Sequence, residues 1–321
     1  MNYKRNGRRA FVKNTAGLAT AMLVSPNAAL CASIDVTSRQ EDLHVNIFSK
    51  HLQFLDYKQM AEVAAEMGFD GIDLTVRPKG HVEPERVEEE LPRAVAAIKD
   101  AGIRADMMVS RITDADTEVH RRVIKTAAAE GIRYYRMGYL SFHEDRSIPA
   151  SLEAYHEAMI RLAEFNKSTG ISGAYQNHAG MRVGAEMWDL YHLMKDIDPD
   201  LLGIQYDVRH AMVEGGTSWQ NGLRLIEDQV TSIVLKDYLW KQIDGQWKVV
   251  NVPLGEGMVD WPSYFKLLKQ KQIHVPVTIH YEYDLGGVEH GAHELHGMTQ
   301  DEVLSKMKKD LELAKKLWRE A

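Results

Sequence analysis

The chain alternates between two hydrophobic patterns from about residue 43 to its C-terminus. Short apolar runs are typical of buried strands, whereas apolar residues recurring every three or four positions are typical of amphipathic helices. The short runs predict eight strands, at Leu43–Ser49, Gly71–Arg77, Ile103–Val109, Ile132–Met137, Ile171–Asn177, Leu202–Val208, Thr231–Lys236 and Val275–Tyr283. The clearest helical patterns lie at Tyr57–Met67, Glu83–Ala101, Glu118–Glu130, Ser151–Ser168 and Thr299–Arg319.

Several predicted helices end in the same way before the next strand, with a glycine at the helix C-terminus. The joints "EMGFDGIDL", "DAGIRADM", "AEGIRYYRM" and "STGISGAY" each place a glycine just after a helix, where the left-handed C-cap conformation favours it. Successive βα units without a linker predict an α/β fold, a single-domain (β/α)₈ barrel. A doubly wound open sheet is the alternative, but no Gly-rich phosphate-binding turn follows the first strand.

The N-terminus has the pattern of an export signal. Arg8 and Arg9 precede an apolar, small-residue stretch at 16–30. We therefore expect a twin-arginine signal over residues 1–32, a barrel over 33–321, and export to the periplasm. The alternative is a disordered basic tail. The apolar stretch is short for a membrane span.

The charge and the cysteine content of the chain limit which classes of partner it can bind and whether disulfides can stabilise it. The formal net charge is −7, and removal of residues 1–32 would make it −12, because that segment holds five basic residues and no acids. Such an acidic body argues against nucleic acid and anionic membranes as partners. The single cysteine, Cys31, rules out a disulfide framework in the barrel. Lipid anchoring at Cys31 is not expected, because the preceding Ala28-Ala29-Leu30 is a poor lipoprotein box.

Polar residues alternate with apolar ones in several predicted strands. In Gly71–Arg77, the alternation points Asp73, Thr75 and Arg77 into the barrel. The same alternation turns inward His44, Asn46, Phe48, Lys50, Gln176, His178, Gln205, Asp207, Thr278, His280 and Glu282. Those near the C-terminal strand ends would meet at the mouth where barrel enzymes hold their chemistry.

Charged side chains buried at the barrel mouth cost free energy unless they are paired with an opposite charge or bind a ligand. A structural ion-pair network is one explanation for these residues, and His44 and His280 could be hydrogen-bonded core histidines. The functional explanation makes them a substrate site. Its expected substrate contacts are Lys50, His51, Gln53, Asp73, Arg77, His81, Arg136 and His290.

Several motifs together resemble a known family. They are "FSKHLQFLDY", "GFDGIDLTVRPKGHVEPE", "YYRMG", "YQNH", "IQYDVRH", "VPLGEGMVDW" and "EYDLGG". From the first strand to the last helix, the chain resembles the xylose isomerase-like TIM-barrel family of sugar phosphate isomerases and epimerases.

The resemblance implies a divalent metal such as Mn, Mg, Co or Zn. Its usual ligands would be Glu, Asp, His and Glu on strands five to eight. Asp207 and Glu282 match this pattern, but Gln176 and Val234 replace the fifth-strand Glu and the seventh-strand His. Two options follow. A metal is held by Gln176, Asp207, His178 and Glu282, or Lys236 supplies the positive charge instead.

The resemblance also implies proton abstraction beside a carbonyl and an enediolate intermediate. Glu282 is the expected base, with His178 or His210 as its acid/base partner and Lys236 as a catalytic cation. The expected substrate is a small free or glycosidic sugar, and the reaction an isomerisation or epimerisation. Elimination from a 3-keto-glycoside and a non-catalytic carbohydrate-binding barrel are alternatives. Relatives commonly form homo-oligomers. His290, His293 and His296 lie in a long loop expected to cover the site.

Overall fold

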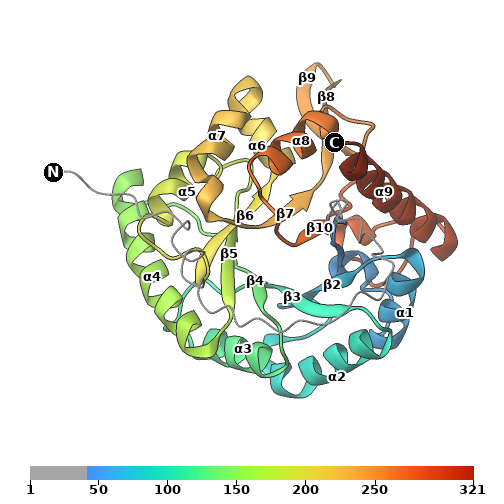
Figure 1. The fold of residues 1–321 in the computed structure, drawn as a ribbon, viewed down its shortest axis with the longest axis horizontal. Helices are drawn as coiled ribbons and strands as arrows, with labels where there is room; N and C mark the ends of the chain where they lie inside the picture. The colour runs from blue at the N-terminus through green and yellow to red at the C-terminus, as the bar shows by residue number, and fades with distance from the viewer. Residues whose placement is uncertain (1–41) are drawn as a thin grey trace, which may run out of the picture. The chain divides into compact units, whose positions relative to one another are not determined.

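The computed structural model describes residues 42–321, so the expected export signal and Cys31 lie outside the described residues. Eight parallel strands form a closed barrel in the order β1-β10-β7-β6-β5-β4-β3-β2 (Figure 1). The barrel strands are β1 (Val45–Phe48), β2 (Gly71–Val76), β3 (Arg104–Ser110), β4 (Tyr134–Arg136), β5 (Ser172–Gln176), β6 (Leu202–Asp207), β7 (Val230–Leu235) and β10 (Val277–Ile279). The (β/α)₈ barrel predicted from the sequence is therefore confirmed.

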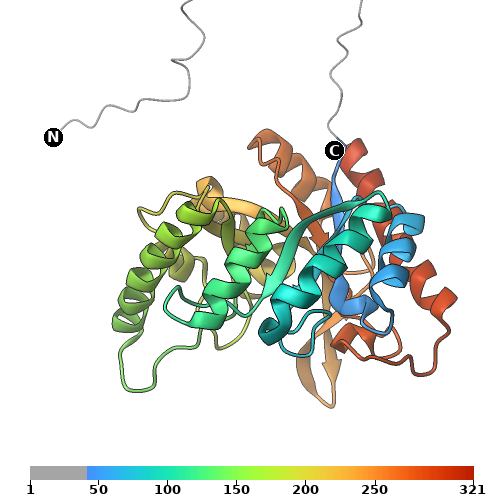
Figure 2. The same cartoon turned by 90° about the horizontal axis from the view of Figure 1, so that it is seen from below.

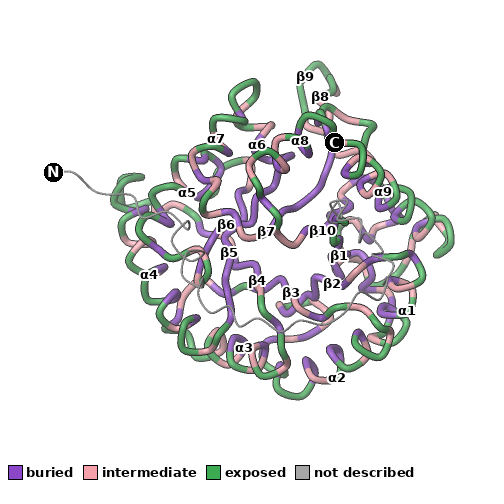
Figure 3. Tube along the Cα trace, viewed as in Figure 1, coloured by how far each residue is buried: buried purple, intermediate pink, exposed green. Residues whose placement is uncertain are grey.

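Helices surround the barrel (Figure 1). They are α1 (Tyr57–Met67), α2 (Val87–Asp100), α3 (Glu118–Ala129), α4 (Ile148–Thr169), α5 (Met187–Leu193), α6 (Val208–Gly215), α7 (Trp219–Ile226), α8 (Trp261–Gln270) and α9 (Gln300–Glu320). Figure 3 shows the barrel strands buried along most of their length and the helices exposed on their outer sides. The core therefore lies between the helices and the barrel, as the two hydrophobic patterns require.

Local signals fix the helix ends. Asp56 and Gln59 form a capping box at the start of α1, and Thr299 and Glu302 form one at the start of α9. Gly68 ends α1 with φ 93°, a left-handed conformation that costs glycine little. No helix within residues 42–321 is long and apolar enough to span a membrane.

A two-stranded antiparallel hairpin, β8 (Asp237–Ile243) and β9 (Gln246–Val252), follows β7 and was not predicted. It projects from the ring of helices in Figure 2. Its two-residue turn is Asp244-Gly245, and both residues have positive φ, 52° and 76°. Asp-Gly is a strong signal for a tight hairpin turn, so the sequence did carry the information.

Asp237 connects this hairpin to the loop before α8. Its buried carboxylate accepts hydrogen bonds from the backbone N–H groups of Tyr238, Gly255, Gly257 and Val259 and from the indole N–H of Trp261, at 2.8–3.2 Å. A Cβ on Gly257 would lie 2.1 Å from Asp237 Oδ1. The motif "VPLGEGMVDW" is therefore explained by a structural role, namely wrapping the loop around one carboxylate.

Candidate active site

A cavity of about 630 Å³ opens at the C-terminal ends of the barrel strands, large enough for a small sugar. Its wall comes from strand ends and the loops that follow them. It is lined by Phe48, Lys50, Arg77, Ser110, Arg111, Thr113, Arg136, Gly138, Tyr139, Ser141, His178, Arg182, His280 and Glu282. This is the end of the barrel at which the sequence predicted the substrate-binding and catalytic residues.

Five of the predicted site residues line this cavity: Lys50, Arg77, Arg136, His178 and Glu282. They come from β1, β2, β4, β5 and β10 or the residues just after them, so side chains far apart in sequence meet at one place. Sequence reasoning missed Arg111, Tyr139 and Arg182, which lie in loops after β3, β4 and β5. Strand alternation gives no information on side-chain direction in loops, and Arg111 lies two residues past the end of the predicted strand Ile103–Val109.

Lys236 lies at the end of β7, behind Glu282, and is only 3% exposed. Its ammonium group has three N–H donors and three partners. They are Asp207 Oδ2 at 2.9 Å, His210 Nε2 at 2.9 Å and Glu282 Oε1 at 3.2 Å. Lys236 and His210 are therefore buried next to the cavity wall and do not form part of it.

These contacts set the charges of the carboxylate and the ammonium group. Burial alone would raise the pKa of Glu282, but Lys236 and Lys50 bring this pKa well below its ordinary value. Burial alone would lower the pKa of Lys236, but Asp207 and Glu282 raise it. Glu282 is thus an ionised carboxylate, about a quarter (26%) exposed, and Lys236 is a permanent cation beside it.

The residues at this position do not fit a divalent metal. The Lys236 ammonium lies between Asp207 and Glu282, the two matching acids of the expected ligand set. The Gln176 amide oxygen already accepts from Arg136 Nη1 at 3.0 Å and from the Tyr139 hydroxyl at 2.6 Å, while its Nε2 donates to Asp207 Oδ2 at 2.8 Å. Over residues 42–321, no group of three or more His, Cys, Asp or Glu side chains is placed to hold a metal.

His178 approaches the cavity from β5, three strands around the barrel from β10, which precedes Glu282. Its Nδ1 donates to the Ala179 carbonyl oxygen at 2.8 Å, so the neutral ring keeps an unprotonated Nε2. Burial and then the charge of Lys236 lower the pKa of His178, which favours this neutral form. The ring packs 4.1 Å from His210 and 4.8 Å from Tyr139, measured between centroids. These contacts hold it in place.

The structure places the other expected substrate contacts outside the cavity wall. His51 donates from Nδ1 to the Val288 carbonyl and accepts at Nε2 from the Tyr281 backbone N–H, so it ties two loops together. His81 contacts Ser49 and Thr75. Gln53 donates to the Lys79 carbonyl oxygen and contacts His293. His290 is 85% exposed beside Glu289. The "FSKHLQ" segment therefore supplies Lys50 to the cavity, while its neighbours fix the surrounding loops.

Asp73 and His44 were both predicted to point into the barrel, and the structure gives them different places. Asp73 is fully buried, and neither of its carboxyl oxygens has a hydrogen-bond partner within the described part of the chain. Burial, partly opposed by Arg136, raises the pKa of Asp73 to about 7. His44 is exposed next to Asp70 and Arg104, so its expected place inside the barrel is wrong. It lies before β1, where alternation no longer applies.

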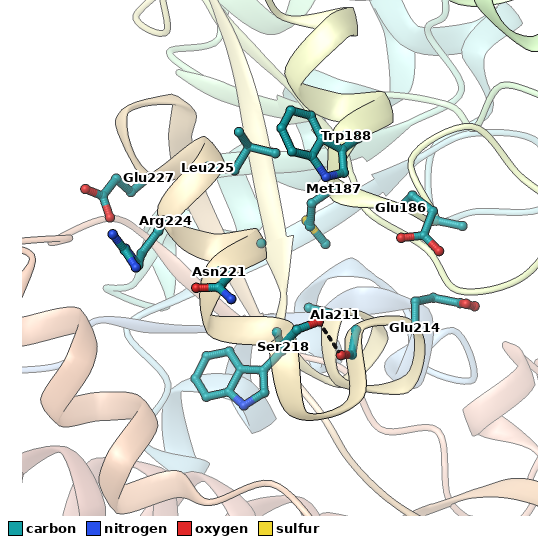
Figure 4. Close-up of a pocket in the computed structure, with 14 residues that line it drawn as sticks. Glu186, Met187, Trp188, Ala211, Glu214, Ser218, Asn221, Arg224, Leu225 and Glu227 are labelled. Atoms are coloured by element: carbon teal, nitrogen blue, oxygen red, sulfur yellow. Dashed lines mark hydrogen bonds between the residues drawn. The ribbon is translucent and has the colours of Figure 1, made fainter.

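A second depression, of about 470 Å³, lies among α5, α6 and α7 (Figure 4). Trp188, Glu214 and Arg224 are among its lining residues, and the Ser218 hydroxyl, which also lines it, donates a hydrogen bond to the Gly215 carbonyl oxygen. No residue of a barrel strand lines it. The cavity at the strand ends is therefore the candidate active site.

Comparison with known proteins agrees with this geometry. The family model described as xylose isomerase-like TIM barrel matches residues 61–316. The D-allulose 3-epimerase from Methylomonas sp. is a similar solved structure, with 16% identity and a TM-score of 0.64 over 86% of this chain and 98% of that one. Comparison with curated proteins found no match.

Two further solved structures share the fold. The 3-keto-D-glucoside 4-epimerase from E. coli has 14% identity and a TM-score of 0.61, covering 85% of this chain and 99% of that one. The D-psicose 3-epimerase from Clostridium cellulolyticum H10 has 12% identity and a TM-score of 0.65, covering 86% and 99%. At these identities the likeness shows the fold, and the family match covers most of the barrel. The chain belongs to the xylose isomerase-like TIM barrel family.

Proposed function

We propose that the protein is a sugar epimerase or isomerase that removes a proton beside a sugar carbonyl. The observation that carries this proposal is the meeting of two acid/base groups, Glu282 and His178, in one cavity at the strand ends. The solved structures that share the fold include epimerases of allulose, psicose and a 3-keto-glucoside, which supports a keto sugar as substrate.

Glu282 is the proposed base. It is ionised, it reaches the cavity, and Lys236 fixes its position through a 3.2 Å hydrogen bond. A base must come within hydrogen-bond reach of the proton it takes, and a held carboxylate on the wall meets that geometric requirement. Because its lowered pKa makes Glu282 a weak base, the cations that stabilise the enediolate must supply much of the driving force for proton transfer. Lys236 is then a positioning residue, because it acts through Glu282 and does not line the cavity.

His178 is the proposed partner. Its unprotonated Nε2 can take a proton from solvent, and the imidazolium so formed can give that proton to the enediolate, after which Glu282 releases the substrate proton to solvent. Because it enters the cavity from a different side of the barrel than Glu282, the enediolate could be reprotonated on its second face or at its second carbon. The first result is epimerisation and the second is isomerisation.

Cations on the cavity wall would stabilise the negative charge that develops on the carbonyl oxygen. Lys50 and Arg136 line the cavity, and Arg136 is almost fully buried. Buried cations aimed at a developing oxyanion are worth more than the same groups in water. The proposal needs no metal, because the chain's own ammonium and guanidinium groups supply the positive charge.

Deuterium incorporation tests the proposal. The protein is incubated in deuterated water with ketoses and 3-keto-glucosides, and the sugars are followed by NMR. We expect deuterium at a carbon next to the carbonyl. Glu282→Gln should reduce the rate by about a hundredfold or more, within the range that general-base catalysis supplies.

Arg224→Gln, in the second depression (Figure 4), is the matched control and should leave the rate unchanged. Full exchange in the folded Glu282→Gln protein would contradict the proposal. Release of an aglycone without a rearranged sugar would contradict the epimerase assignment and support elimination, which shares the first step.

A further inference from the structure

One side of the cavity carries an unusual amount of positive charge. Five cationic side chains line it, against one carboxylate, although the whole chain has a formal net charge of −7. Each comes from the end of a different one of the first five strands or the loop after it: Lys50, Arg77, Arg111, Arg136 and Arg182. Because β1 to β5 are neighbours in the barrel, these residues form a continuous group, called here the cationic arc.

No carboxylate of the described residues forms a direct salt bridge with the cationic arc. Four of the five side chains make cation–π contacts with aromatic rings. Lys50 Nζ and Arg77 Cζ lie 5.6 and 5.5 Å from the centroid of Phe48. Arg136 Cζ and Arg182 Cζ lie 4.7 and 4.5 Å from that of Tyr139. Cation–π contacts orient a cation and leave its charge in place.

The crowding of like charges has a cost. The pKa of Lys50 is lowered to about 8, mainly by burial; Glu282 opposes this shift, and the charges of Lys236, Arg77 and Arg136 add to it. Burial and then Arg136 and Arg111 lower the pKa of Arg77 to about 10. Arg136 Nε, moreover, has no hydrogen-bond partner anywhere in residues 42–321. An anion placed among these groups would relieve the repulsion and satisfy the free donors.

We infer that the substrate is an acidic sugar, whose oxyanion group binds the cationic arc while its carbonyl carbon faces Glu282. The guanidinium group pairs with carboxylate, sulfate and phosphate through two parallel hydrogen bonds, which a neutral hydroxyl cannot match. Glu282 would repel the same oxyanion, so the two sides of the cavity fix one orientation of the sugar. The inference rests on the proposed function for the carbonyl chemistry, but the binding of an acidic sugar can be tested without it.

Calorimetry with matched sugars tests the inference. The probes are D-glucuronate, D-glucose 6-sulfate and D-glucose 6-phosphate, with D-glucose as the neutral reference. We expect at least one acidic sugar to bind about tenfold or more tightly than glucose, and to bind more weakly as salt is raised. Comparing the three acids shows which oxyanion the arc prefers.

Arg182→Gln is the diagnostic variant, because Arg182 is exposed and its loss leaves the barrel core intact. It should weaken the acidic sugar about fivefold or more and leave glucose binding unchanged. Arg224→Gln should change neither. Glucose binding as tightly as all three acids, or equal losses for acidic and neutral sugars in Arg182→Gln, would overturn the inference. Tight acidic-sugar binding without any deuterium exchange would uphold it and contradict the proposed reaction instead.

Discussion

At the scale of single residues, Lys236 is the main difference between this site and the metal site that the family resemblance implied. One ammonium group contacts Asp207 and Glu282, two of the expected metal ligands, and also His210, an expected acid/base residue. The sequence already offered both options, because Val234 cannot ligate and Lys236 follows two positions later on the same side of the strand. Only the three distances distinguish them, because residue types alone do not say where a long side chain ends.

Lys50 gives the site a pH dependence. Its pKa of about 8 reflects burial first, and then the opposing charges of Glu282 on one side and Lys236, Arg77 and Arg136 on the other. Lys50 is therefore charged below this pH and loses its charge above it. We expect KM for an acidic substrate to rise as pH increases from 7 to 9, while KM for a neutral analogue changes little. Steady-state kinetics across this range measures both.

Lys50→Arg is the control for this prediction. Arginine keeps its charge throughout the range, so the rise in KM should move to higher pH or disappear. An unchanged profile in Lys50→Arg would show that another group titrates.

Replacing Asp73 by asparagine is expected to stabilise the folded protein. Its pKa of about 7 lies above its ordinary 3.8, mainly because the carboxyl group is fully buried, and Arg136 offsets only part of this shift. The folded protein keeps this proton up to about pH 7, whereas the unfolded chain loses it near pH 4. Stability therefore falls between these values as pH rises. Asp73→Asn should raise the free energy of unfolding by about 2–3 kcal/mol more at pH 8 than at pH 5. Urea unfolding at both pH values checks this, and an equal effect at the two would contradict it.

At the scale of elements, strand alternation predicted much of the site and loop positions escaped it. Lys50, His178 and Glu282 were found because they continue the inward alternation of β1, β5 and β10 just past the strand ends. Arg111 and Arg182 were missed because a loop has no fixed periodicity. His51 and His81 were misplaced because a polar residue near a barrel mouth can serve the loops as readily as the substrate.

The β8–β9 hairpin and the loop before α8 depend on Asp237. Asp237→Ala would leave five N–H donors without their acceptor, four of them on the backbone. We expect a loss of about 3 kcal/mol or more in the free energy of unfolding. Amide hydrogen exchange should show faster exchange confined largely to residues 237–261. Gly257→Ala, which pushes a methyl group against the same carboxylate, should act in the same direction. A stable Asp237→Ala protein with unchanged exchange would contradict the role.

At the scale of the whole molecule, charge is unevenly distributed. The chain is acidic overall, yet its cavity wall is cationic on the side of β1 to β5 and acidic only at Glu282. The net charge of a sequence describes the body and conceals such a site, because the two have opposite signs. Acidic sugars are therefore compatible with an acidic protein. The export expected from the N-terminal segment remains a prediction, and it suits a substrate met outside the cytoplasm.

The central claim is that Glu282 moves a sugar proton with charge stabilisation from the chain's own cations. Deuterium exchange into the sugar tests it most directly, measured on protein treated with a strong chelator and shown to be metal-free by elemental analysis. We predict that the stripped wild-type protein exchanges at its original rate and that stripped Glu282→Gln does not. Exchange that vanishes on stripping and returns only with Mn or a similar ion would contradict the account.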